Sequence, residues 1–245
     1  RGVSQVLEDG YRLVLLDVGD DEGNEAAMLE RASREAAGIL IYPLCRPGNT
    51  AILQSIVDSG TPMVCVDRIP ADLRAFGVVS NNYEASRRGM DALREAGHRR
   101  IAFFSGDNDH VSTIQDRYRA YQDSTDFDTR SMERWFPKSL EARPERLAQA
   151  TLDAVYTLLH YAEPPTAIFC TQDCYAMAVL DAFERLRLTD RPDVLTYNDW
   201  PPMMLRNPGS LFRIVQNARE IGRRAAESLL AQIQGRAGEP ETVHV

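Results

Sequence analysis

Polar and charged side chains follow several apolar runs of this sequence, at the point where each run ends. They are Asp67 and Arg68 after 63–66, Gln172 and Asp173 after 166–170, Asn198 and Asp199 after 194–197, and Gln216 after 211–215. Amide and carboxylate groups exchange hydrogen bonds with hydroxyl groups, and an arginine presents a fixed planar fork of donors. This mixture suits a small, hydroxyl-rich ligand better than an apolar one.

The elements that must position these side chains alternate between short apolar runs and longer amphipathic segments. We predict strands over 11–18, 38–43, 63–66, 78–79, 101–105, 166–170, 194–197 and 211–215, an edge strand at most over 135–137, and a closing strand over 241–245. Helices are predicted over 25–36, 49–59, 84–96, 112–122, 144–160, 174–187 and 218–234. Such alternation with short connections is typical of right-handed crossovers and parallel sheets, which bind ligands at the carboxyl ends of their strands. Arg117, on the helix after the strand that ends at Ser105, therefore joins the candidate ligand-binding residues.

Composition narrows the class of protein. The chain has 245 residues, of which 44% are hydrophobic and 26% charged, and a formal net charge of −8, which argues against a broad basic face for nucleic acid. No apolar run approaches the length of a membrane span. The four cysteines show no CxxC spacing, and Cys65 and Cys170 lie inside apolar runs, which favours buried free thiols and a reducing compartment such as the cytoplasm. With four scattered histidines, they give no metal signature, so we expect neither metal nor cofactor.

An enzyme is not indicated, because the sequence has no GxGxxG, Walker loop or G-x-S-x-G motif and no evident pair of nucleophile and base. The chain starts at Arg1, without an initiator methionine, in residues typical of the end of a helix. We therefore expect the natural N-terminus, and at least one strand before residue 1, to be absent from this sequence.

Several segments resemble the lactose/galactose-repressor family of bacterial transcription regulators. They are VDRIPADLRAFGVVSNNYEASRRGMDALREAGHRRIAFFSG (66–106), QDRYRAYQDS (115–124), PPTAIFCTQDCYAMAVLDAFERL (164–186), VLTYND (194–199) and VQNAREIGRRAAESLLAQIQG (215–235). The resemblance implies the family's effector-binding core: two doubly wound parallel-sheet α/β lobes, similar to periplasmic sugar-binding proteins, with three crossovers and a ligand cleft between them. The crossings are expected near Ser80-Asn81, Gln216-Asn217 and Gly238–Glu241. The expected lobes are 1–79 with 217–237 and 80–216 with 238–245, and the family's helix-turn-helix DNA-binding domain would precede residue 1.

The resemblance also carries site residues over one at a time. Asp67 and Arg68 match a strand-end pair that binds sugar hydroxyls, and Arg117 matches a ligand-facing arginine. Gln172 stands where the family usually has Asn, and Asn198 where it usually has Asp. Gln216 matches a hinge residue, and Tyr42 falls at a strand end of the first lobe. Structural roles stay open for Arg68 and Arg117 as ion-pair partners, for Gln216 as a support of the hinge backbone, and for Asp173 as a helix cap.

The function implied by the resemblance is effector sensing by a transcription regulator. The expected ligand is a sugar or sugar derivative, the expected assembly is a homodimer, and operator DNA is contacted only through the DNA-binding domain, with no membrane partner. The alternative is an extracytoplasmic sugar-binding protein of a transporter, which shares the fold. The cysteines and the Gly97–Ile101 stretch favour the regulator.

Overall fold

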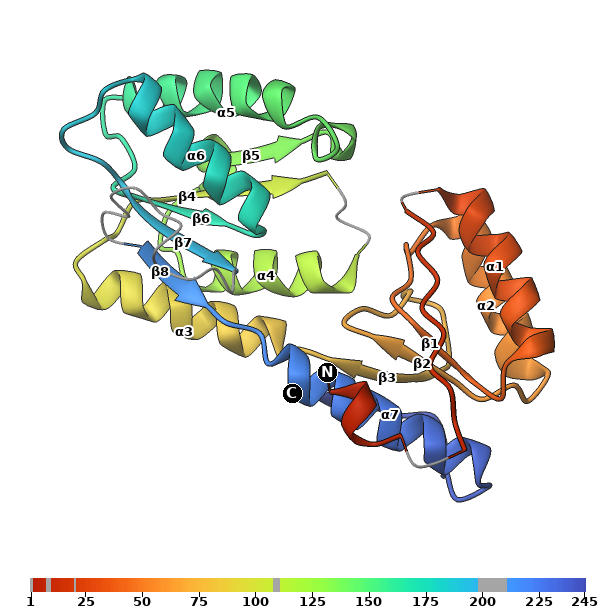
Figure 1. Ribbon diagram of the computed structural model, residues 1–245. Coiled ribbons are helices and arrows are strands. Elements are labelled where there is room, and N and C mark those ends of the chain that lie inside the picture. Colours follow the sequence, from red (N-terminus) through yellow and green to blue (C-terminus); the bar gives the residue numbers. More distant parts are fainter. Residues whose placement is uncertain (1, 8–9, 20, 108–110, 198–210) are drawn as a thin grey trace. The chain divides into compact units, whose positions relative to one another are not determined.

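A computed structural model describes residues 2–7, 10–19, 21–107, 111–197 and 211–245 (Figure 1). The chain divides into two compact units, each built around one parallel sheet. Unit 1 is Arg1–Asn81, His110–Thr113 and Asn217–Val245, and unit 2 is Asn82–Asp109 and Ile114–Gln216. The expected α/β class with two parallel sheets is confirmed.

Unit 1 contains a four-stranded sheet with the order β1-β2-β3-β9. Its strands are β1 (Ile39–Ile41), β2 (Met63–Val66), β3 (Phe76–Val79) and β9 (Thr242–His244), and its helices are η1 (Val3–Gln5), α1 (Glu22–Glu35), α2 (Pro47–Asp58) and α7 (Ala218–Ile233). Alternate side chains of β2 face opposite sides: Met63 and Cys65 pack with α1 and α2, whereas Val64 packs with α7. Both faces of this sheet are therefore covered, as is usual for parallel strands.

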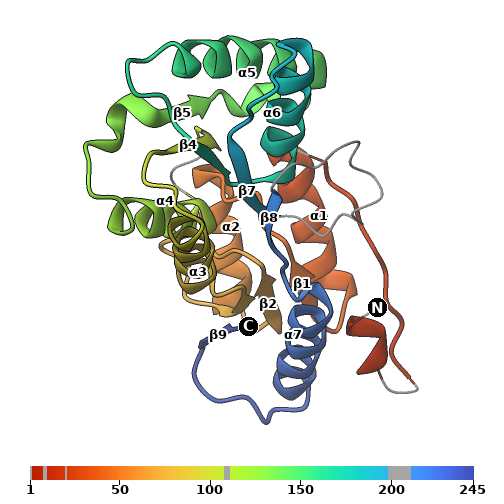
Figure 2. The same cartoon turned by 90° about the vertical axis from the view of Figure 1, so that its left-hand side faces the viewer.

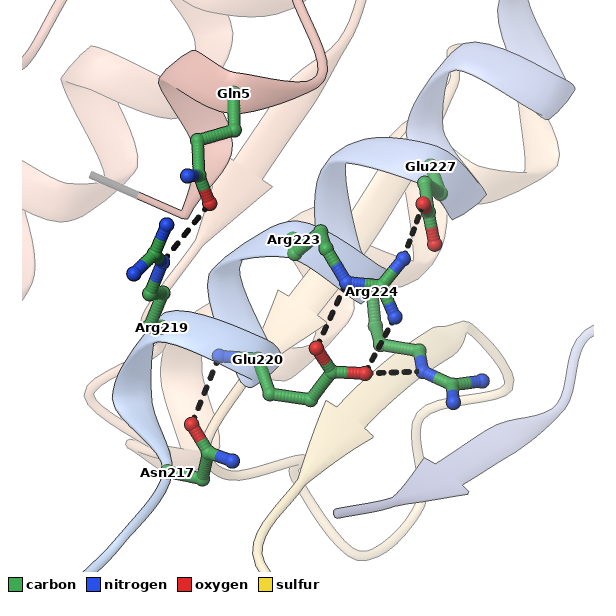
Figure 3. Close-up of polar contacts among 7 residues, drawn as sticks. All are labelled: Gln5, Asn217, Arg219, Glu220, Arg223, Arg224 and Glu227. Atoms are coloured by element: carbon green, nitrogen blue, oxygen red, sulfur yellow. Dashed lines mark hydrogen bonds and ion pairs between the residues drawn. The ribbon is translucent and has the colours of Figure 1, made fainter.

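The start of α7 is held by an exposed polar network (Figure 3). The Asn217 side chain caps the helix by accepting the Glu220 N–H at 3.2 Å, and the Glu220 carboxylate accepts hydrogen bonds from Arg223 and Arg224. Arg219 Nε donates to Gln5 Oε1 at 3.0 Å, which ties η1 to this helix. The sequence N-x-x-E thus works as a capping motif whose acid also neutralises the following arginines.

Unit 2 contains a five-stranded parallel sheet with the order β5-β4-β6-β7-β8. Its strands are β4 (Ile101–Gly106), β5 (Glu133–Phe136), β6 (Ala167–Cys170), β7 (Asp193–Tyr197) and β8 (Leu211–Ile214); its helices are α3 (Asn82–Glu95), α4 (Ser112–Asp123), η2 (Thr129–Met132), η3 (Lys138–Leu140), α5 (Pro144–Leu159) and α6 (Asp173–Arg185). Helices α5 and α6 cover one face, and α3 and α4 cover the other (Figures 1 and 2). The predicted edge strand is confirmed as β5.

The strand predicted over 11–18 is wrong. The segment has no regular secondary structure and pairs with no strand among the described residues, and its apolar side chains are exposed, with 68% of Val14 and 90% of Leu15 accessible. An apolar run becomes a strand only when a neighbouring strand satisfies its backbone hydrogen bonds, and the described sheet of unit 1 ends at β1.

The assignment of 238–245 to the second lobe is also wrong. These residues supply β9, which runs parallel to β3 in unit 1, with Val78 opposite Val243. The ladder continues through the Val245 N–H, which donates to Val79 O at 2.9 Å. Because 217–245 all lie in unit 1, the chain does not pass to unit 2 between Gly238 and Glu241. The strand with which a short strand pairs depends on residues far away in the sequence, so it cannot be predicted from the residues of the short strand alone.

Candidate ligand-binding site

The carboxyl ends of β1 and β2 bring three predicted residues of unit 1 together. These strands are parallel, with Ile41 opposite Cys65, so the residues that follow them leave the sheet at the same edge. The Arg68 guanidinium carbon lies 4.1 Å from the centroid of the exposed Tyr42 ring. At this distance the positively charged guanidinium group interacts favourably with the face of the aromatic ring.

Asp67, which follows β2 immediately, has a left-handed backbone conformation, with a φ of +68°. Its N–H donates to Val78 O at 2.8 Å, which fixes the turn after β2 against β3. Among residues other than glycine, aspartate and asparagine adopt this conformation most readily, so the residue type serves the turn as well as any ligand.

Arg117 on α4 is the centre of the polar cluster in unit 2. The side chain is buried, with 5% accessible, and its Nε and Nη2 both donate to Asn82 Oδ1, at 3.0 and 2.8 Å. Its Nη1 donates to Thr171 O at 2.5 Å, just beyond the end of β6. The guanidinium carbon also lies 3.6 Å from the centre of the Tyr197 ring.

Tyr197, the last residue of β7, extends this cluster. Its hydroxyl donates to Asn82 O at 2.8 Å and lies 2.8 Å from Ser86 Oγ, and burial raises the pKa of its phenol. Beside it, Thr171 Oγ1 donates to Ser105 Oγ at 2.9 Å. The carboxyl ends of β4, β6 and β7 therefore present hydroxyl, amide and guanidinium groups around the start of α3, a set suited to directional hydrogen bonding.

The remaining predicted residues differ in how far the structure places them. Gln172 is the half-buried N-cap residue of α6, and its Oε1 lies 3.9 Å from Cys174 Sγ. Asp173 is the first helical residue and not the cap, which corrects its expected role. Gln216 is half-buried and ends unit 2 at the boundary with unit 1. Asn198 lies outside the described residues.

Asn82 and Tyr197 belong to the unit 2 cluster, but neither is among the site residues predicted from the sequence. The predicted helix begins at residue 84, whereas α3 begins at Asn82. Tyr197 falls within the apolar strand predicted over 194–197, although its hydroxyl is a polar group at the carboxyl end of that strand. Tyr197 immediately precedes the predicted site residue Asn198, and this position could have marked it as a further candidate.

Two other kinds of site are not found in the part of the chain that the structure describes. No group of three or more His, Cys, Asp or Glu residues there could hold a metal ion. None of the described helices is both long enough and apolar enough to cross a membrane.

The comparisons with known proteins decide the family. A family model for a periplasmic binding protein-like domain matches residues 90–245, more than half of the chain. The chain belongs to this family. The probable HTH-type transcriptional regulator EndR from Paenibacillus polymyxa is 27% identical over 232 residues, which cover 92% of this chain and 65% of EndR. The chain thus spans just under two thirds of that relative.

Solved structures of regulators share the periplasmic binding protein-like fold with this chain. The Cra regulator from Pseudomonas putida, solved with fructose 1-phosphate, has a TM-score of 0.78 at 20% identity and matches 100% of this chain and 90% of that one. A CelR–cellobiose complex has a TM-score of 0.79 at 23% identity and matches 100% of this chain and 74% of that one. At these identities the likeness establishes the fold. Together with the similarity to EndR, it confirms the predicted resemblance to the effector-binding core of the lactose/galactose-repressor family.

Proposed function

We propose that this chain is the sensing part of a bacterial transcription regulator and that it binds a small polar effector, a sugar or sugar derivative. The observation that carries the proposal is the collection of hydrogen-bonding side chains at strand carboxyl ends, with Tyr42, Asp67 and Arg68 in unit 1 and the Arg117 cluster in unit 2. The proposal also assigns ligand contacts to Gln172, Asn198 and Gln216.

The ligand class follows from the chemistry of these groups. Guanidinium and amide donors pair with sugar hydroxyls or with a phosphate, and a tyrosine ring stacks on an apolar sugar face. The two similar structures were solved with fructose 1-phosphate and with cellobiose, which supports the same class for this chain. The proposal is a binding function, without a reaction, in a cytoplasmic protein that modulates operator DNA binding, most simply as a repressor.

Calorimetry tests the site directly. The purified chain is titrated with D-ribose, cellobiose and fructose 1-phosphate, and the ligand that binds is titrated against Arg68→Ala and Asp67→Asn. Asparagine is chosen at position 67 because alanine would be strained at a φ of +68°. Each variant should weaken binding by about tenfold to a hundredfold, the loss typical of one charge-assisted hydrogen bond.

The matched control is Arg74→Ala. Arg74 is exposed in the same loop, and its backbone N–H donates to Gln54 Oε1 at 3.3 Å. Its removal should leave affinity unchanged. Absence of binding by all three probes, or equal affinity in wild type and both site variants, would contradict the proposal.

The alternative function, an extracytoplasmic sugar-binding protein of a transporter, differs from a regulator in the process that the ligand controls. All four cysteines are free, and three of them are buried, which favours a reducing compartment. For a regulator, the full-length gene product should retard DNA from upstream of its own operon in a mobility-shift assay, and the effector should change that affinity. A gene product that binds the sugar but not this DNA would favour a sugar-binding protein of a transporter.

A further inference from the structure

Glu25 on α1 is a buried carboxylate, with 2% of the residue accessible. Its Oε1 accepts the Leu44 N–H at 2.8 Å, and its Oε2 accepts Asn49 Nδ2 at 2.6 Å. Asn49 is buried as well, and the same Nδ2 donates to Glu22 O at 2.9 Å. Burying a carboxylate is unfavourable in free energy, so we expect its hydrogen bonds to fix a part of the chain that the fold or the function requires.

The segment that Glu25 holds is the loop 42–46, which joins β1 to α2. Leu44 and Cys45 are buried in this loop, and Cys45 has a φ of +56°, a left-handed conformation that is unfavourable for a cysteine. Such a conformation persists only where surrounding contacts impose it. The Glu25 hydrogen bond to Leu44, immediately before Cys45, is one such contact.

The same loop begins with Tyr42, whose ring lies against the Arg68 guanidinium. We propose that Glu25 is a positioning residue for the ligand-binding edge of unit 1: its carboxylate holds the loop 42–46 so that Tyr42 lies against Arg68. The inference rests on the proposed function, since it names a residue that shapes the proposed site without touching the ligand.

The chemistry of a carboxylate explains why glutamate is needed. Both of its oxygens accept, so it serves the Leu44 N–H and the Asn49 amide at once. In Glu25→Gln, one of these positions becomes an NH₂ group, which faces either Leu44 N–H or Asn49 Nδ2, donor against donor. Turning the Asn49 amide to present its oxygen would give up the hydrogen bond to Glu22 O. The variant therefore keeps the size of the side chain but loses at least one hydrogen bond.

The four free cysteines supply a ligand-independent measurement. The chain is treated with iodoacetamide, and the labelling rate of each cysteine is followed by mass spectrometry. Cys45 is 7% accessible and reports opening of the loop, whereas Cys170 is fully buried in unit 2 and reports global unfolding. Glu25→Gln should raise the Cys45 rate by about tenfold, as expected for loss of one buried hydrogen bond, and leave Cys170 unchanged. The control is Glu30→Gln, the same change at an exposed position of α1, which should alter neither rate.

Ligand affinity supplies the second measurement. Whichever of D-ribose, cellobiose and fructose 1-phosphate binds the wild type should bind Glu25→Gln several-fold more weakly, by calorimetry. In a Tyr42→Leu background, Glu25→Gln should cause no further loss of affinity, because the ring through which it acts is gone, while Cys45 should still label faster. This non-additivity distinguishes a positioning residue from one that only stabilises the fold.

The outcomes separate cleanly. An unchanged Cys45 rate in Glu25→Gln overturns the inference, and so does a faster rate with unchanged affinity. If the wild type binds none of the probes while Cys45 still labels faster, the proposed function fails and Glu25 only holds a loop. If Cys170 labels as fast as Cys45, the variant has unfolded, and Asn49→Ala replaces it, because that change removes one partner and leaves the carboxylate in place. Asn49→Ala must then reproduce the Cys45 and affinity changes, or the inference is overturned.

Discussion

At the scale of single residues, Arg117 shows how one side chain can be both a site candidate and a structural support. The sequence suggests that it faces the ligand, yet it is buried and donates three hydrogen bonds within unit 2, two of them to the same Asn82 oxygen. The planar guanidinium suits this arrangement because two of its N–H groups can point at one acceptor while a third points elsewhere. Any contact with ligand must therefore use an arginine that also organises the start of α3 and the end of β6.

Arg117→Ala should accordingly destabilise the protein as well as weaken ligand binding. The buried Asn82 and Thr171 acceptors lose their donors, and a cavity remains beside Tyr197, so the free energy of unfolding should fall by about 2–4 kcal/mol. Urea unfolding measures this fall, with Arg88→Ala on the exposed face of α3 as a control that should change little. Equal stability of Arg117→Ala and wild type would show that Arg117 is only a ligand contact.

At the scale of elements, the exposed segment 11–18 is the main irregularity of unit 1. An exposed apolar segment that pairs with no strand among the described residues is prone to pair with other chains. Leu15→Lys places a charge at the most exposed of these positions and should reduce concentration-dependent aggregation of the 245-residue chain, by light scattering, without changing its melting temperature. Glu30→Lys, a comparable substitution on α1, serves as the control. Unaltered aggregation in Leu15→Lys would show that this segment is not the adhesive surface.

The start of α7 provides an element with a defined pH response (Figure 3). Hydrogen bonds from Arg223 and Arg224 lower the pKa of Glu220 from 4.5 to about 2. A carboxyl group with a lowered pKa in the folded state stabilises that state above the pKa of the unfolded chain and loses this effect as pH falls. The stabilisation is therefore present at pH 7 and disappears between about pH 5 and pH 2.

Glu220→Gln should lower the melting temperature at pH 7 in low salt by a small amount, because this network is exposed. The difference from wild type should shrink at pH 3 and in 1 M NaCl, which screens exposed charges. Differential scanning calorimetry under the four combinations of pH and salt measures this. A difference that persists at low pH and high salt would assign the effect to the side-chain amide and not to charge.

At the scale of the whole molecule, we expect the chain to form a homodimer, because regulators that bind two-fold symmetric operators match that symmetry in the protein. Sedimentation equilibrium at micromolar concentration should show a dimer in both wild type and Leu15→Lys. The variant is the control that separates a specific dimer from association through 11–18. A monomer in Leu15→Lys would count against a specific dimer of this chain.

The fold class could be predicted from the sequence, and a candidate site proposed from it, because both rest on local patterns. The alternation of apolar strands and amphipathic helices determines a parallel α/β architecture, and polar residues after strands 63–66 and 166–170 mark the ends at which such sheets bind ligands. These features follow from the types of residues and their spacing within short segments of the sequence.

What only the tertiary structure decided depends on contacts between distant residues. The apolar pattern of 11–18 predicts a strand, but a strand exists only where a neighbour pairs with it. The closing strand was expected from its sequence, yet its place beside β3 is set by the ladder that it completes. The burial of Arg117 and of Glu25 could not be predicted either, because a charged side chain is buried only when hydrogen-bonding partners replace its water. For Arg117 these partners are Asn82 and Thr171. For Glu25 they are Leu44 and Asn49, and all four come from other parts of the chain.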